Sequence, residues 1–248
     1  PGTLGAKFID YVVADSMVIP SSHRRYYSES VIYMPNSYQP NDDARQISTM
    51  QCSRAENGLP ENAFVLCCFN QSYKISPREF HVWMRVMKAV DDSVLWLLSS
   101  NIWAERNLRQ QAVQSGIDPQ RLIFAKRVPQ AEHLARHRLA DLFVDTFNYN
   151  AHTTASDAVR MGVPIVTLKG NTFHSRVCAS ILNSLSMKDL ITYNKKDYQE
   201  LAIELGKNFE KLNEVKTFLQ NSVKNALLFD SINFTKNLES LYLRLLKN

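Results

Sequence analysis

The stretch LFVDTFNYNAHTTASDAVRMGVPIVTL at residues 142–168 decides the fold. Its ends, 142–145 and 164–168, are short and almost entirely apolar, as strands buried on both faces of a sheet are. Between them a polar loop leads into a helical segment, ASDAVRMG, at 155–162. Strand, helix and strand in this order predict two parallel strands joined by a helical crossover.

The same alternation extends toward the N-terminus. Further apolar runs occupy 64–69, 93–98 and 121–124. Ser76-Pro77-Arg78-Glu79 is a capping box with proline at the first helical position, and it predicts a helix directly after the first run. AERNLRQQAVQSG ends on Gly116, a common helix stop. We therefore expect an α/β protein with a Rossmann-like, doubly wound parallel sheet.

The two ends of the chain differ from this central part. FIDYVVAD and SVIYMP predict two short strands, and residues 37–47 are rich in Asn, Asp and Pro, which indicates a linker. We place a domain boundary near residue 50. The last fifty residues predict helices with an apolar stripe formed by Phe234, Leu238, Leu241 and Leu245. We interpret the stripe as core packing; a partner-binding face is the alternative.

Composition excludes several classes of protein. The net charge of +5 comes without a dense Lys/Arg tract, so a solvated surface, or a basic cleft for an anionic small molecule, is favoured over nucleic-acid binding. No apolar run approaches the roughly 20 residues that span a membrane, and no signal peptide is visible. The four cysteines form no metal or disulfide pattern and predict buried free thiols in a reducing, cytoplasmic setting. The chain opens PGTLGAKF without methionine, so we expect a fragment or a processed product.

Ligands of open α/β sheets bind beyond the carboxyl ends of the strands, where three polar loops stand out. In FNQSYK, Lys74 precedes the capping box and could reach a phosphate near the helix N-terminus; alternatively, it is a surface lysine whose stem rests on Tyr73. In RVPQAEHLAR, His133 and Arg136 are three apart and share a helix face. They could stack on a base and contact its edge, or belong to an ordinary solvent-facing helix.

A third loop carries the polar set NAHTTASD at the start of the 155–162 helix. Thr154 and Asp157 have the spacing of a capping box, which is a purely structural interpretation. Alternatively, the helix N-terminus and the hydroxyls of Thr153 and Thr154 bind a phosphate, and Asp157 accepts from sugar hydroxyls. No GxxxxGK[ST] loop and no clear DxD motif is present, so protein groups, not Mg²⁺, would neutralise a diphosphate.

Taken together, these motifs resemble those of a known protein family. PGTLGAKFIDYVVAD, FNQSYKI, VPQAEHLARHRLADLFVDT, AHTTASDAVRMGVPIVTL and SRVCAS resemble, in order, the C-terminal catalytic region of the O-GlcNAc transferase family. These are inverting, metal-independent glycosyltransferases of the GT-B fold. The resemblance implies that residues 1–50 are the tail of the N-terminal catalytic lobe with its linker, and that 51–248 are the C-terminal, nucleotide-sugar-binding lobe.

The resemblance also implies residue roles. Lys74 would stabilise the leaving diphosphate, His133 would stack on uracil, and Asp157 would bind ribose. The full set of implied catalytic and donor-binding residues is Lys74, Gln71, Gln130, His133, Arg136, Tyr149, His152, Thr153, Thr154, Asp157, Gly2 and Thr3. Gln130 replaces a lysine of the animal enzymes, and Tyr149 replaces a smaller cysteine near the donor sugar. The short linker indicates a bacterial-type chain without the intervening domain.

The implied activity is transfer of a sugar, GlcNAc from UDP-GlcNAc in the first instance, to Ser/Thr hydroxyls of acceptor proteins with inversion. Two alternatives stay open: another donor, such as UDP-glucose or GDP-fucose, or a non-catalytic nucleotide-sugar-binding module. Expected partners are the donor, an acceptor protein, and an upstream lobe with tetratricopeptide repeats. No nucleic acid, membrane, metal or cofactor is expected, and the sequence indicates no general base.

Overall fold

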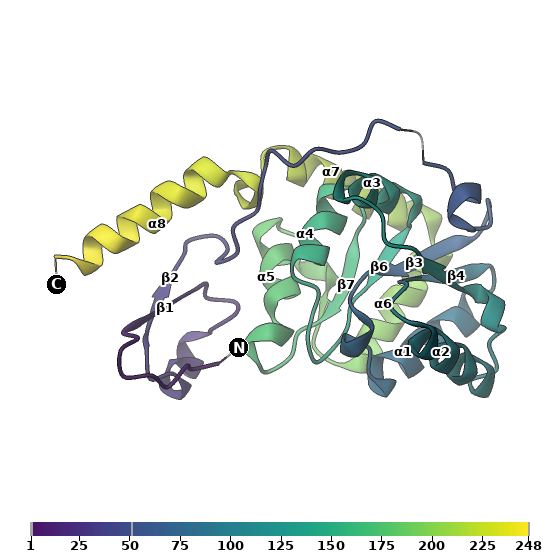
Figure 1. Ribbon diagram of the computed structural model, residues 1–248, viewed down its shortest axis with the longest axis horizontal. Helices are drawn as coiled ribbons and strands as arrows, with labels where there is room; N and C mark the ends of the chain where they lie inside the picture. Colours follow the sequence, from purple (N-terminus) through teal and green to yellow (C-terminus); the bar gives the residue numbers. More distant parts are fainter. Residues whose placement is uncertain (1, 51, 248) are drawn as a thin grey trace.

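The computed structural model describes residues 2–50 and 52–247. A six-stranded parallel sheet with helices on both sides forms the main body, and a two-stranded parallel sheet lies beside it (Figure 1). The strands are β1 (Tyr11–Ala14), β2 (Ser30–Tyr33), β3 (Phe64–Cys68), β4 (Ser93–Leu98), β5 (Leu122–Ala125), β6 (Leu142–Val144), β7 (Ile165–Leu168) and β8 (Ile191–Thr192). The helices are α1 (Pro77–Ala89), α2 (Ile102–Gln114), α3 (Gln130–Arg136), α4 (Thr153–Arg160), α5 (Val177–Ser184), α6 (Lys195–Lys207), α7 (Phe209–Lys224) and α8 (Ser231–Leu245).

The strand order in the large sheet is β5-β4-β3-β6-β7-β8. The chain runs outward in one direction from β3 and in the other from β6, so the winding reverses between these two neighbours. α1 packs beside α6, which covers β6 and β7, while α4 and α5 pack together against β7. The predicted doubly wound α/β fold is thereby confirmed.

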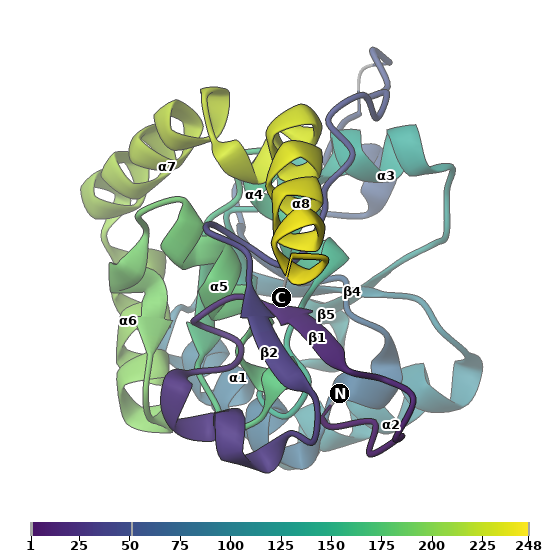
Figure 2. The ribbon, with the colours of Figure 1, turned by 90° about the vertical axis from the view of Figure 1, so that its left-hand side faces the viewer.

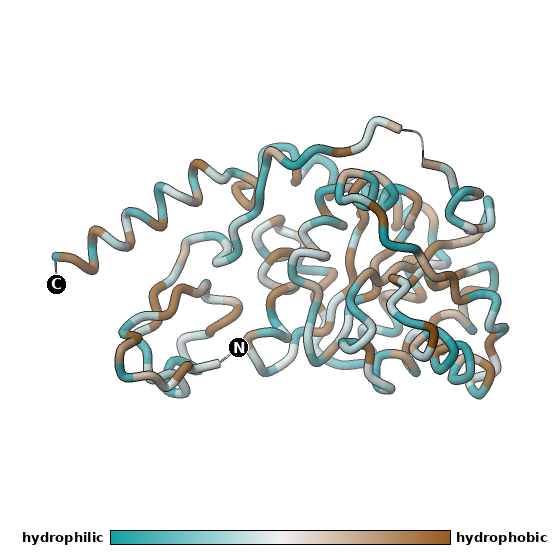
Figure 3. Tube along the Cα trace, viewed as in Figure 1, coloured by the Kyte–Doolittle hydropathy of each residue, from teal (hydrophilic) through white to brown (hydrophobic). Residues whose placement is uncertain are grey.

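The strands of the large sheet are hydrophobic along nearly their whole length, as expected for strands covered on both faces (Figure 3). Trp83 of α1 and Trp96 of β4 are among the largest fully buried side chains. Cys67, Cys68 and Cys178 are buried free thiols, as predicted, and burial raises their pKa values. These thiols are packing groups. The prediction is wrong for Cys52, which is free but only half-buried.

The N-terminal residues form a small unit of β1, β2 and a 3₁₀ helix at Ser21–Tyr26. α8 runs above this unit in both views (Figures 1 and 2). In the apolar stripe of α8, Leu241 is buried while Phe234, Leu238 and Leu245 remain half-buried. The expectation of core packing is therefore met by Leu241 and only partly by the other three. The predicted boundary near residue 50 adjoins Gln51, which lies outside the described residues, as do Pro1 and Asn248.

The segment interpreted as a linker, 37–47, contains no helix or strand, yet it is docked on the main body. Gln39 is buried and its amide donates to Ser156 Oγ of α4 at 2.9 Å. The amide of Asn41 donates to the Leu228 carbonyl at 3.1 Å. The polar side chains of this segment therefore attach it to α4 and to the turn before α8.

Candidate functional site

The two loops that diverge at the reversal of winding are tied together by one buried amide. Asn70, directly after β3, is 1% exposed. Its Nδ2 donates to Thr146 Oγ1 at 2.8 Å, and its Oδ1 accepts from Thr154 Oγ1 at 2.6 Å. This residue therefore fixes the loop after β3 against both the loop after β6 and the start of α4.

Lys74 lies at the centre of this edge of the sheet. The confirmed capping box of Ser76 and Glu79 starts α1 immediately after it and so sets its position. Its Nζ donates to the Asn150 carbonyl at 3.1 Å and lies 4.0 Å from the ring centroid of Tyr149. Burial lowers the pKa of Lys74, although the charge of Asp145 opposes this shift. An ammonium group held by a carbonyl and a ring is available to an incoming anion.

The alternative that the Lys74 stem rests on Tyr73 is wrong. Tyr73 is 80% exposed, whereas Lys74 is half-buried and its ammonium contacts the loop after β6. The 3₁₀ turn at Ser72–Lys74 explains this, because it directs neighbouring side chains to different sides.

Tyr149 is the middle of an aromatic cluster. Its ring lies nearly parallel to those of His152 and His174, with centroids 4.7 Å and 5.2 Å away. Nε2 of His152 donates to the His174 carbonyl at 3.2 Å. Burial lowers the pKa of His152 to about 4, so this imidazole is neutral near pH 7. Tyr149 is 36% exposed, and its ring forms part of the surface beside Lys74.

Asp145 shapes the loop that carries Tyr149 and His152. Its fully buried carboxylate accepts from the backbone N–H groups of Thr146 (2.8 Å) and Ala151 (2.7 Å), and from Thr167 Oγ1 (2.6 Å). Burial raises the pKa of Asp145 to about 6 despite these donors. The sequence interpretation missed this residue; its only signal is an acid at the end of an apolar strand.

The capping box proposed for Thr154 and Asp157 is wrong. α4 begins at Thr153, its N-cap is His152, and no side chain caps it. The Thr154 hydroxyl is taken by Asn70 instead. Within the described residues no hydrogen bond occupies the exposed Thr153 hydroxyl, so the first turn of α4 presents this hydroxyl and its N-terminal N–H groups outward.

Asp157 is 7% exposed and forms an ion pair with Arg45, whose Nη1 lies 2.7 Å from its Oδ1. Oδ2 has no partner among the described residues. Burial raises the pKa of Asp157, and the Arg45 charge opposes that rise. Nothing in the sequence indicated Arg45, which lies 112 positions away in the predicted linker.

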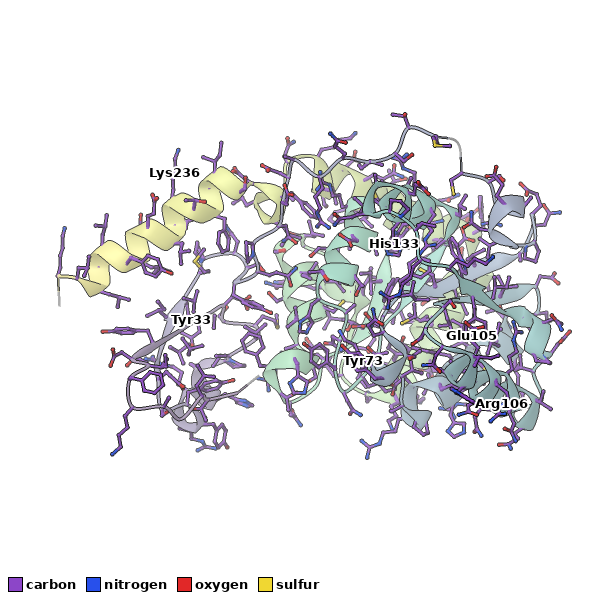
Figure 4. All side chains as sticks on the ribbon, in the orientation of Figure 1. Tyr33, Tyr73, Glu105, Arg106, His133 and Lys236 are labelled. Carbon is purple, nitrogen blue, oxygen red and sulfur yellow. The ribbon has the colours of Figure 1, made fainter. Side chains whose placement is uncertain are left out.

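α3 carries His133 and Arg136, which share a face as predicted: Arg136 Nη2 donates to His133 Nδ1 at 2.6 Å. Because a guanidinium can only donate, the neutral His133 ring carries its proton on Nε2. Burial, and secondarily Arg136, lower the pKa of His133 to about 4. Figure 4 shows His133 near α3, above Tyr73 in that view. Gln130 begins α3 and is exposed.

A pocket of about 250 Å³ lies against α3. Arg136 and Val128 form one wall, and residues after the linker, including Met50 and Cys52, form the other. Arg136 is 3% exposed and donates to the Lys126 carbonyl at 2.6 Å. His133 is not among the lining residues; it packs against Phe69 with ring centroids 5.1 Å apart.

The remaining predicted residues lie outside the cluster around Lys74 and Tyr149. Gln71 accepts from Arg127 Nη2 at 3.2 Å on the loop after β3. Thr3 belongs to the small unit, where its hydroxyl donates to Glu29 Oε2 at 2.8 Å; the backbone N–H of Leu4 donates to Oε1 of the same carboxylate. A Cβ added at Gly2 would meet nothing within 4 Å.

The arrangement suits an anionic ligand lying across the strand ends, with Lys74 and the α4 N-terminus in the middle. Among the described residues, no cluster of three or more His, Cys, Asp or Glu side chains could hold a metal ion. Likewise, no helix in the described part of the chain is both long and apolar enough to cross a bilayer.

Comparison with known proteins identifies relatives along the whole chain. The family model "Glycosyl transferase family 41" matches residues 1–51 and 41–238. A probable UDP-N-acetylglucosamine–peptide N-acetylglucosaminyltransferase of Arabidopsis thaliana is 34% identical over 99% of this chain. A UDP-N-acetylglucosamine–peptide N-acetylglucosaminyltransferase of Caenorhabditis elegans is 34% identical over 78% of it. The chain spans 26% of the length of the Arabidopsis protein and 17% of the nematode protein.

The fold also matches solved structures. An O-GlcNAc transferase of Thermobaculum terrenum superposes with a TM-score of 0.84 at 24% identity, covering 98% of this chain and 46% of that one. Anabaena HepE, solved in complex with UDP, superposes with a TM-score of 0.59 at 15% identity, covering 90% of this chain and 58% of the other. At these identities the likeness concerns the fold alone.

Proposed function

Because the chain belongs to glycosyl transferase family 41, we propose that it is the donor-binding part of an enzyme that transfers a sugar to Ser or Thr hydroxyls of acceptor proteins. The names of the relatives suggest UDP-GlcNAc as the donor and a peptide as the acceptor. We propose that transfer proceeds with inversion and without a metal ion, in the cytoplasm. An upstream lobe with tetratricopeptide repeats would complete the protein.

One observation carries this proposal: Lys74 and the uncapped start of α4 lie together where the winding reverses. A diphosphate placed there would meet an ammonium, the Thr153 hydroxyl and the helix N-terminus. In the proposed pose the nucleoside extends toward α3, where the pocket beside Arg136 would receive the base. His133, neutral, packed on Phe69 and bonded to Arg136, would offer its ring and its Nε2–H to the base.

The proposed reaction is a direct displacement. The acceptor hydroxyl oxygen forms a bond to the anomeric carbon while the bond from that carbon to the diphosphate oxygen breaks, which inverts the anomeric configuration. The electron pair and the growing negative charge pass to the diphosphate, where Lys74 and the start of α4 stabilise them without reorganising. The hydroxyl proton passes to a general base.

A thermal-shift panel tests the proposal directly. UDP and UDP-GlcNAc should raise the melting temperature in a concentration-dependent way, because a ligand of the folded state stabilises it by mass action. GDP-fucose, with a larger base, should not. Absence of a shift with every uridine nucleotide at millimolar concentration would refute the nucleotide site.

Asp157→Asn is expected to weaken UDP binding about tenfold. The free Oδ2 is the oxygen that would accept from a ribose hydroxyl, and a hydrogen bond to a charged group contributes about 1.5–3 kcal/mol. Isothermal titration with UDP measures the change, and Asp42→Asn, at an exposed carboxylate of the linker, is the matched control. Unchanged affinity in the Asp157 variant would contradict the ribose role.

Tyr149 favours a second candidate for the donor, a sugar without the N-acetyl group, such as that of UDP-glucose. The ring projects beside Lys74, where the donor sugar would follow the diphosphate. Tyr149→Cys should shift the ratio of UDP-GlcNAc to UDP-glucose affinity toward UDP-GlcNAc by about tenfold, within the 1–3 kcal/mol that pocket size typically controls. Tyr149→Phe keeps the ring and should leave the ratio unchanged. Equal ratios in the wild type and the Cys variant would exclude Tyr149 as a donor selector.

A further inference from the structure

A second, larger pocket lies at the same edge of the sheet, beyond β6, β7 and β8. Its volume is about 700 Å³, and it is open to solvent. The lining residues come from the loops that follow these three strands and from the start of α1, and they include Arg78, Lys169, Gly170, His174, Tyr193 and Lys195. The proposed nucleotide site uses none of them.

The lining is cationic. Arg78, Lys169 and Lys195 contribute three positive charges, and no Asp or Glu lines the pocket. Within residues 2–50 and 52–247 these three side chains form no ion pair. The nearest acids along the chain, Glu79 and Asp197, are engaged by Ser76 and Asn194 in the caps of α1 and α6. The positive character of the lining therefore comes from the three side chains and not from the starts of these two helices, which their own caps and acids occupy.

One wall of the pocket is rigid. The buried guanidinium of Arg176 donates to the carbonyls of Gly170 at 3.0 Å and Asn171 at 2.9 Å. Thr172 and Ser175 close the turn by a reciprocal capping box. A Cβ at Gly170 would lie 2.3 Å from Ser175 Oγ, so the turn requires glycine there. A wall fixed in this way is preorganised, and binding costs little ordering of the backbone.

The pocket is continuous with the region where the sugar would be transferred. His174 lines it and also stacks on Tyr149, which lies under Lys74. Arg78 lies in the first turn of α1, whose N-cap, Ser76, follows Lys74 closely in the sequence. A polypeptide extends at most about 3.3–3.6 Å per residue, so a peptide with its hydroxyl near Tyr149 would place its next few residues in this pocket.

We propose that this pocket binds acidic side chains of the acceptor polypeptide, within a few residues of the Ser or Thr that receives the sugar. The inference rests on the proposed function for its acceptor. Lysine and arginine groups would meet the carboxylates, and the exposed ring of Tyr193, which lies 5.5 Å from Lys169 Nζ, would cover the peptide backbone. The enzyme would then prefer hydroxyls flanked by Asp or Glu.

The test measures binding of two fluorescein-labelled peptides that differ only in charge. One carries a serine followed by four glutamates, and the other has four glutamines in their place. The proteins are the wild-type chain, the double variant Lys169→Gln/Lys195→Gln, and Lys236→Gln/Lys247→Gln, which removes the same charge from α8 and its end. Lys236 points away from the main body (Figure 4).

We expect the glutamate peptide to bind the wild type and the α8 variant equally, and the pocket variant at least tenfold more weakly. The glutamine peptide should bind all three proteins as weakly as the pocket variant binds the glutamate peptide. Equal affinity of the glutamate peptide for wild type and pocket variant, or of both peptides for wild type, overturns the proposal. The proposal is also overturned if the pocket variant binds UDP-glucuronic acid more weakly than the wild type does but binds the glutamate peptide equally well. The carboxylate that the pocket recognises would then belong to a nucleotide-sugar donor.

UDP affinity, measured on the same three proteins, separates this proposal from the proposed function. The pocket variant should bind UDP as the wild type does. Failure of the wild type to bind UDP would refute the nucleotide site alone, while loss of peptide discrimination with normal UDP binding would refute the pocket alone.

Discussion

Lys74→Ala is expected to lower the rate of sugar transfer by about 10²–10³-fold in the full-length protein, with the fold intact. Loss of a single preorganised group that stabilises transition-state charge typically has this cost. Lys74 is the only ammonium held at the meeting point of the strand-end loops by a carbonyl and a ring among the described residues. Burial lowers its pKa, so the charged group is not a source of folding stability.

Two further variants make the Lys74 experiment decisive. Lys88→Ala removes an exposed lysine from the other end of α1 and should leave turnover unchanged. Lys74→Arg keeps the charge but not the shape of the donor, and should recover only part of the rate. The melting temperature of each variant shows whether the fold survives. Turnover within threefold of wild type in Lys74→Ala would remove Lys74 from the mechanism.

The sheet could be predicted because burial on both faces leaves a simple trace in the sequence. Each of the five predicted central strands is a short apolar run, and all five occur in the structure within one or two residues of the expected bounds. β8, only two residues long, was missed because a run that short has no periodicity. The right-handed crossovers then leave little freedom in the topology.

The candidate site was predictable only in part. Lys74, Tyr149, His152 and Thr153 follow strand ends, and strand ends of a parallel sheet meet at one edge; their proximity therefore follows from the fold. Contacts between distant segments leave no such signal. The pairing of Asp157 with Arg45 depends on how an irregular segment crosses α4, which no local pattern encodes. Asn70 behaves similarly, since one amide serves two partners in the segment after β6 and one in the first turn of α4.

Acidification from pH 7 to pH 5 is expected to destabilise the fold strongly. Burial lowers the pKa of His137 to about 3, and those of His133 and His152 to about 4. In the unfolded chain these imidazoles titrate near 6.5, so between pH 6.5 and 4 the unfolded state binds more protons than the folded state. The stability that these neutral imidazoles contribute is therefore fully present above pH 6.5 and is lost as the pH falls below that value. For the fully buried His137 alone the loss at pH 5 is about 2 kcal/mol.

Asp145 acts in the opposite direction. Its folded pKa of about 6 lies above the ordinary value of 3.8, so its carboxyl takes up a proton more readily in the folded state and adds stability as the pH falls from 6 toward 4. Asp157, whose pKa burial also raises, acts in the same direction as Asp145. The net slope stays destabilising because burial also lowers the pKa values of His23 and His174, so five histidines oppose these two acids. Urea unfolding at pH 7, 6 and 5 measures this slope. His133→Gln should reduce it, and His81→Gln, at an exposed position of α1, should not. An unfolding free energy that stays constant from pH 7 to 5 would show that these imidazoles titrate normally in the folded chain.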